Sequence, residues 1–78
     1  MPTCLRVGPY RLFFYSNDGS EPPHIHVERE ASQAKFWLTP VRLEWNRGFG
    51  RKEIRQIRRI IEDHREELLR CWDDFFNG

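Results

Sequence analysis

Apolar and polar residues alternate through the first half of the chain, and beyond Gly50 the apolar residues recur every three or four positions. Alternation is typical of half-buried strands, and the longer spacing is typical of an amphipathic helix. The pattern therefore predicts one α+β domain over residues 1–78. We expect a small antiparallel sheet at 4–46, followed by a long C-terminal helical region at 50–76.

The sheet region contains four segments with the composition of strands, at residues 10–16, 24–29, 34–39 and a short one at 41–45. Residues 16–23 separate the first two and are rich in Ser, Asn, Asp, Gly and Pro, which favour turns. Pro40 separates the last two. We therefore expect three or four strands. Gly8-Pro9 is expected to interrupt any strand nearer the N-terminus.

Alternation also predicts which residues share a face of the sheet. Ile25 and Val27 are expected on one face, with His24, His26 and Glu28 on the other. In the last strand we expect Val41, Leu43 and Trp45 on one side. The aromatic residues are expected to form most of the core, although Phe36 and Trp37 are adjacent, so one of them must face away from it.

The helical region carries a continuous apolar stripe: Ile54, Ile57, Ile61, Leu68, Trp72 and Phe75, with His64 in register. This stripe predicts one helix from about Arg51 to Phe76. A straight helix of that length would measure roughly 39 Å, whereas a domain of this size is only about 25–30 Å across. A bend or break near 62–64, or projection onto a second subunit, is the alternative, but the unbroken stripe favours a single helix.

Charge is unevenly distributed, although the net charge is only +1. Segment 47–59 carries six cations, Arg47, Arg51, Lys52, Arg55, Arg58 and Arg59, against Glu53 alone. Such a segment could bind nucleic acid, with Trp45 and Phe49 stacking on bases, or a partner protein, or it could be a solvated face. Segment 62–74 is acidic, so an antiparallel second copy would match opposite charges. Together with the apolar pair Phe75 and Phe76 at the chain end, this predicts a homodimer.

The two cysteines, Cys4 and Cys71, lie at opposite ends of the chain. Secreted mini-proteins usually carry more pairs, so we expect free thiols, with one disulfide joining the ends as the alternative. The sequence has no apolar run long enough to span a membrane and no signal-peptide layout at its start. These features predict a cytoplasmic protein with no membrane contact.

His24 and His26 are the leading candidates for chemistry. On a strand their side chains share a face and could converge on Zn or another transition metal, with Glu28 or His64 as a third ligand. The same histidines, with His64, could act as acid and base on a phosphodiester. The alternative is a structural pair whose rings hydrogen-bond to nearby backbone.

Several segments resemble a prokaryotic family of uncharacterised small proteins, domain-of-unknown-function family 4160: Tyr-Arg-Leu-Phe-Phe-Tyr-Ser-Asn-Asp-Gly, Glu-Pro-Pro-His-Ile-His-Val, Ala-Lys-Phe-Trp-Leu-Thr-Pro-Val and the helical tail at 64–72. Gly50 stands where this family typically has Ser or Asp before the helix. The resemblance implies a two-gene, toxin–antitoxin-like system with a small protein partner. It brings no catalytic residues.

The sequence therefore supports two functions. The first is a binding module of such a two-gene system, which contacts a partner protein, and in addition could contact nucleic acid, through segment 47–59. The second is a small phosphodiester-acting or metal-dependent enzyme that uses His24 and His26. Whether the protein is an enzyme stays open at this point.

Overall fold

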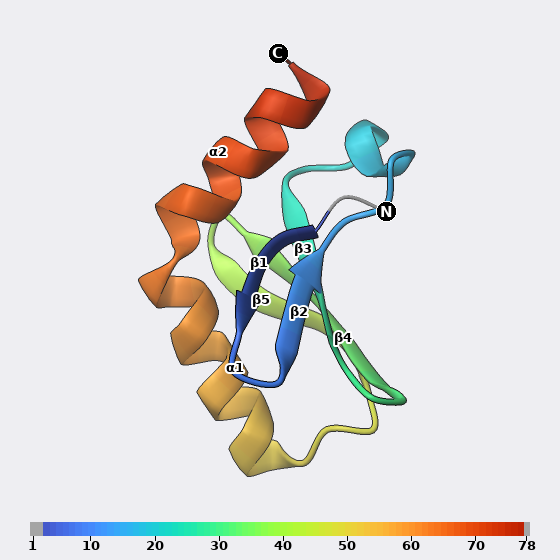
Figure 1. Cartoon of the computed structure of the whole chain (residues 1–78), viewed down its shortest axis with the longest axis vertical. Helices are drawn as coiled ribbons and strands as arrows, with labels where there is room; N and C mark the ends of the chain where they lie inside the picture. Colours follow the sequence, from blue (N-terminus) through green and yellow to red (C-terminus); the bar gives the residue numbers. More distant parts are fainter. Residues whose placement is uncertain (1–2, 78) are drawn as a thin grey trace.

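The structure is a computed structural model that describes residues 3–77. Its elements are β1 (Thr3–Val7), β2 (Tyr10–Phe13), η1 (Asp18–Ser20), β3 (His24–Arg29), β4 (Ser32–Leu38), β5 (Val41–Arg47), α1 (Arg51–Asp63) and α2 (Arg65–Phe76). The five strands form one antiparallel sheet in the order of the sequence, and both helices follow it (Figure 1). The predicted α+β class is confirmed, but the sheet has five strands, where three or four were expected.

The additional strand is β1, which pairs with β2 at one edge of the sheet. Gly8-Pro9 was expected to interrupt any strand nearer the N-terminus. It instead turns the chain so that Val7 pairs with Tyr10. Gly8 has a φ of +55°, a conformation that costs glycine little. The same dipeptide that interrupts a strand therefore makes a tight connection between two strands.

The expected single long helix is wrong, because the helix breaks at His64. His64 has φ −113° and ψ 15°, and its ring Nδ1 lies 2.8 Å from the carbonyl oxygen of Ile60. The chain resumes at Arg65, whose guanidinium donates to Leu38 O and Thr39 Oγ1 at the β4–β5 turn. The two helices thus bend around the sheet within a molecule 35 Å long (Figure 1).

Both helices cover the same face of the sheet, and the core lies between them and that face. Ile25 and Val27 point into it, as their alternation predicted. The apolar stripe of the helices stays in phase across the break, because all four of its most buried members reach this core: Ile57, Ile61, Leu68 and Trp72. A change of direction at His64 therefore exposes none of these four.

Trp45 does not lie on the same side of β5 as Val41 and Leu43, as was expected, because a β-bulge interrupts the β4–β5 pairing. Lys35 pairs with Trp45, but the next residue, Phe36, pairs with Leu43. The extra residue on β5 turns Trp45 to the face opposite the helices, while Leu43 stays on the core side. Trp37 also lies on the face opposite Phe36, so it is the member of that adjacent pair that turns away from the core.

Cys4 and Cys71 form a disulfide bond that joins β1 to α2. The expectation of free thiols is therefore wrong. Sequence spacing could not reveal the pairing, because 67 positions separate the two residues and only the fold brings their Cα atoms to 6.0 Å. None of the helices in the described residues is long and apolar enough to cross a membrane.

Candidate metal centre

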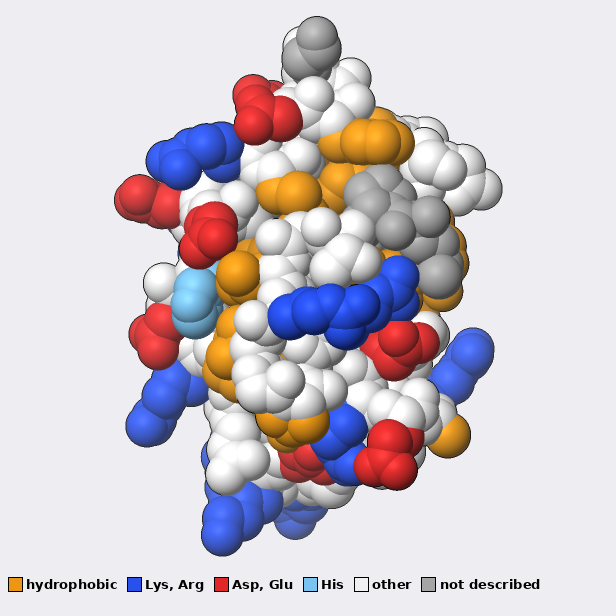
Figure 2. All heavy atoms as spheres, in the orientation of Figure 1, with side chains coloured by type: hydrophobic (Ala, Val, Ile, Leu, Met, Phe, Trp, Pro, Cys, Tyr) orange, Lys and Arg blue, Asp and Glu red, His pale blue; other side chains and the backbone are white. Residues whose placement is uncertain are grey.

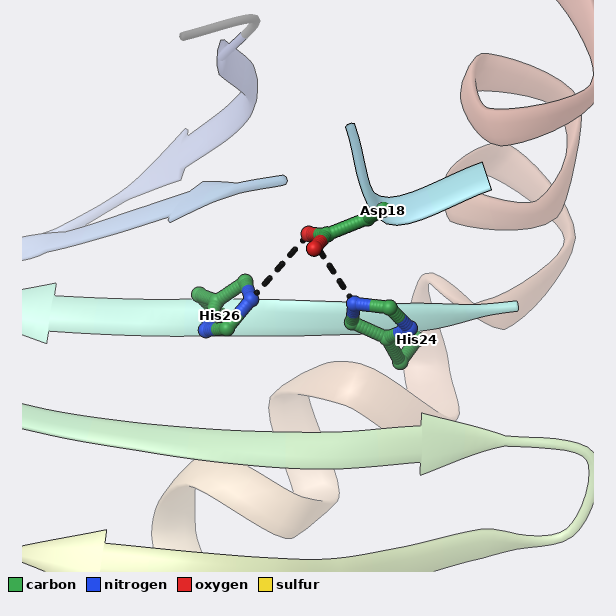
Figure 3. Close-up of side chains that lie close together, drawn as sticks. All are labelled: Asp18, His24 and His26. Carbon is green, nitrogen blue, oxygen red and sulfur yellow. Dashed lines mark hydrogen bonds and ion pairs between the residues drawn. The ribbon is translucent and has the colours of Figure 1, made fainter. Parts of the chain in front are cut away.

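Asp18, His24 and His26 come together beside the start of β3, on the face of the sheet opposite the one that the helices cover (Figure 3). The two histidines are alternate residues of β3, so both rings point the same way. Asp18 belongs to the turn that precedes β3. Its Oδ2 accepts the amide of Tyr15 at 2.9 Å, and its own amide donates to the Tyr15 carbonyl. This reciprocal pair fixes the carboxylate above β3.

One carboxylate oxygen faces both rings. Oδ2 of Asp18 lies 3.0 Å from Nε2 of His24 and 3.3 Å from Nε2 of His26. In a tetrahedral zinc site, bonds of 2.0–2.1 Å place neighbouring ligand atoms about 3.3 Å apart. Both distances to Asp18 are therefore close to those that such an ion imposes, and all three atoms lie within 4.8 Å of one another.

The protonation of His24 follows from its other nitrogen. Nδ1 lies 2.9 Å from the carbonyl oxygen of Pro22, which can only accept, so Nδ1 carries a proton. In the neutral ring, Nε2 then has only a lone pair, and this lone pair faces the Asp18 carboxylate. Nε2 is buried and forms no hydrogen bond within residues 3–77. A proton or a metal ion must lie between these two atoms for the contact to be favourable.

The site is enclosed by aromatic side chains. His24 is fully buried between Trp37 and Trp72, and His26, 6% exposed, stacks on Phe13. Burial lowers the pKa of His26, so its ring is neutral near pH 7. Burial alone would raise the pKa of Asp18, but the amide of Tyr15 and the nearby histidines outweigh it and lower this pKa. A neutral imidazole and an ionised carboxylate are the forms that bind metal.

A family model described as "Domain of unknown function (DUF4160)" matches residues 10–73, which include all three site residues. The chain belongs to the DUF4160 family. No curated protein and no solved structure matches the chain.

Sequence reasoning placed two of the three residues of this DUF4160 site. Neither suggested third ligand lies beside them: Glu28 pairs with Arg11 at 2.8 Å, and His64 lies at the α1–α2 junction. Among residues 3–77, Asp18 completes the only group of three metal-ligating side chains with this spacing. The Ser-Asn-Asp-Gly turn was visible, but a turn of eight residues does not show which polar side chain folds back onto the strand.

The six cations of segment 47–59 separate into different environments. Arg58 is half-buried and donates to Val41 O at 2.9 Å, and Arg47 stacks over Trp45 on the open face of the sheet. Phe49, expected to stack on bases, is instead buried in the core. The remaining cations are exposed on α1 and form what we call the α1 cationic stripe: Arg51, Lys52, Arg55 and Arg59.

Glu53, the one acid of the segment, does not neutralise this stripe. Both its oxygens accept from Arg29, at 2.7 and 3.0 Å, and Tyr10 donates to Oε2 at 2.7 Å. Figure 2 shows Lys and Arg side chains gathered at the end of the molecule where α1 begins, with Asp and Glu side chains along α2. The charge separation along the sequence is therefore kept on the surface of this DUF4160 protein.

Proposed function

We propose that this protein binds a transition metal ion, with Zn²⁺ the best match, through Asp18, His24 and His26. One observation carries the proposal: Nε2 of His24 lies 3.0 Å from an Asp18 oxygen in a buried site, while Nδ1 donates to a backbone carbonyl. Histidines that bind metals almost always donate their second nitrogen in this way. Nε2 of His26 lies 3.3 Å from the same oxygen and can donate its own proton to it, whereas a metal ion would use the lone pairs of both rings at once.

Three protein ligands leave a fourth position for water, which is the pattern of catalytic zinc sites. That position would open beside Asp18, whose side chain is 17% exposed, because both histidines are buried. A bound ion would lower the pKa of such a water and make it a nucleophile. This chemistry supports the metal-dependent enzyme among the two functions expected from sequence, with a phosphodiester as the candidate substrate.

The experiment is elemental mass spectrometry on untagged protein, as purified and after reconstitution with Zn²⁺ and gel filtration. We expect about one ion per chain, and its loss in Asp18→Asn and His26→Gln. His64→Gln is the matched control and should keep the ion. Because His24 is fully buried, its replacement is avoided, and circular dichroism should confirm that each variant folds. No retained ion in the wild type would refute the proposal.

A second function rests on a different surface. We propose that the α1 cationic stripe docks on an acidic protein surface, either the partner of a toxin–antitoxin-like gene pair or the α2 of a second copy. The supporting observation is that no carboxylate lies within ion-pair distance of these four cations in the described residues. Light scattering should detect a dimer that Arg55→Glu with Arg59→Glu dissociates. A monomer that also fails to copurify with the adjacent gene's product would refute this function.

A further inference from the structure

The open face of the sheet carries alternating aromatic and cationic residues along β4 and β5. Across the two strands, Trp37 pairs with Arg42, and Lys35 pairs with Trp45. Arg47 extends the row, with its guanidinium 4.8 Å from the centre of the Trp45 ring. We call these five residues the β4–β5 ladder. The extra residue of β5, opposite Lys35 and Phe36, creates this ladder, because without it Trp45 would face the core.

The cations of the ladder differ in how they are neutralised. Lys35 forms an ion pair with Glu21 at 2.7 Å and lies 4.6 Å above the ring of Trp37, so it is already engaged. Arg42 and Arg47 are exposed, and within residues 3–77 no carboxylate lies at ion-pair distance from either. Two arginines beside two half-buried indoles therefore remain available for an anionic ligand.

Trp37 also borders a cavity. Its indole N–H donates to Glu44 at 2.9 Å, which fixes the plane of the ring. The cavity measures about 240 Å³ and is lined by Pro22, Pro23, Trp37, Thr39, Pro40 and Arg42. It is smaller than the roughly 300–1,000 Å³ of pockets for drug-sized ligands. A single ring system beside an arginine fits this volume better than a whole cofactor does.

We infer that the β4–β5 ladder binds single-stranded nucleic acid. Trp37 and Trp45 would each stack on a base in place of the cation that lies over the ring, Lys35 or Arg47. Arg42 and the displaced Arg47 would contact phosphates. Aromatic side chains on an open sheet, interleaved with cations, are the general means of binding unpaired strands. Diagonal neighbours across two strands lie roughly 7–8 Å apart, which separates the two rings enough for successive unstacked bases.

Two other occupants fit less well. A duplex hides the faces of its bases, so it could use the arginines but not the indoles. An acidic peptide could likewise use only the charges. The inference does not depend on metal binding, although the ladder borders the metal centre: Trp37 lies 5.6 Å from His24 and Trp45 5.9 Å from His26, between ring centres.

The test measures fluorescence anisotropy of labelled oligo(dT) and oligo(rU) 12-mers, together with quenching of tryptophan emission. Arg42→Glu with Arg47→Glu removes the proposed phosphate contacts. Arg55→Glu with Arg59→Glu makes the same change of charge on the α1 cationic stripe and is the matched control. Trp37→Leu removes one stacking surface. Circular dichroism and urea unfolding verify that all variants fold.

We expect the ladder variant to bind about tenfold or more weakly, and the slope of log K against log salt to become shallower by about 1.4. Trp37→Leu should lose about fivefold or more and part of the quenching. The stripe variant should change affinity less than about threefold, since it leaves the ladder intact. Equal losses in both charge variants, equal binding of duplex or polyglutamate, or binding without quenching would each overturn the inference.

Discussion

Nε2 of His24 and Oδ2 of Asp18 lie 3.0 Å apart in a buried site, which is ion-pair distance. The Pro22 carbonyl determines this relationship, because it accepts a hydrogen bond from Nδ1–H and so directs Nε2 toward the carboxylate. The nitrogen that remains is directed at a carboxylate that a second imidazole also approaches. His24 and His26, which follow Asp18 by six and eight positions, therefore direct their nitrogens at its carboxylate. This convergence is the condition for a small metal centre.

Zinc should stabilise the fold. An ion that binds only the folded state adds RT ln(1 + [L]/Kd), about 2.7 kcal/mol at 100 times Kd. We expect the thermal midpoint of the wild type to rise with Zn²⁺ and to return to its original value with EDTA. Asp18→Asn should show no zinc-dependent rise, and His64→Gln should respond like the wild type. A rise of equal size in Asp18→Asn would mean that zinc binds elsewhere.

The disulfide should contribute strongly to stability. Cys4 and Cys71 close a loop of nearly the whole chain, which restricts the unfolded state. We expect Cys4→Ser with Cys71→Ser to lower the free energy of unfolding by about 2–4 kcal/mol, measured with urea. Adding a reductant to the wild type should give the same loss and should not affect the variant. If reductant leaves the wild-type midpoint unchanged, the two sulfurs are not bonded in solution.

Stability should depend on the charge of Glu53. Hydrogen bonds from Arg29 and Tyr10 lower the pKa of Glu53. The stabilisation is therefore complete above the ordinary carboxyl pKa of about 4.3 and disappears as the pH falls toward the lowered value. Urea midpoints of the wild type and Glu53→Gln should differ near pH 7 and converge in acid. Glu30→Gln, which removes a more exposed partner of the same Arg29, should give a much smaller gap.

The start of α1 should accept a better cap. Gly50 occupies the N-cap position with extended backbone angles, and its site has no side-chain hydrogen bond and no atom near an added Cβ. An Asp there could accept from a free amide of the first turn and would lie near Arg51 and Lys52. We expect Gly50→Asp to stabilise the protein by about 0.5–1 kcal/mol in urea unfolding. Gly50→Ala, which adds a side chain but no acceptor, should give no such gain.

The local pattern predicted most elements because alternation and helical spacing are short-range properties. It identified three strands closely, the core face of Ile25 and Val27, and the helical stripe. It failed at β1, where Gly8-Pro9 makes a turn between strands, and where the answer depended on residues far apart. The break at His64 involves no Pro or Gly and is anchored by Arg65 on the β4–β5 turn, and Cys4 meets Cys71 only after folding.

The site shows the same division. Two imidazoles on alternate residues of a strand are readable from sequence, since a strand fixes their relative direction. The third member is not, because the position of Asp18 depends on a turn that folds back through the Tyr15 amide. The β4–β5 ladder also depends on a bulge, and the alternation of β5 gives no sign of that extra residue.

Cobalt substitution tests the metal centre most directly, because the visible spectrum of Co²⁺ reports the geometry and ligands of the ion. We would titrate metal-free protein with Co²⁺ and then displace it with Zn²⁺. The account predicts intense visible bands typical of a four-coordinate ion, saturating near one equivalent, abolished by Zn²⁺ and by Asp18→Asn but kept in His64→Gln. Only the weak spectrum of hydrated Co²⁺, or bands that persist in Asp18→Asn, would contradict it.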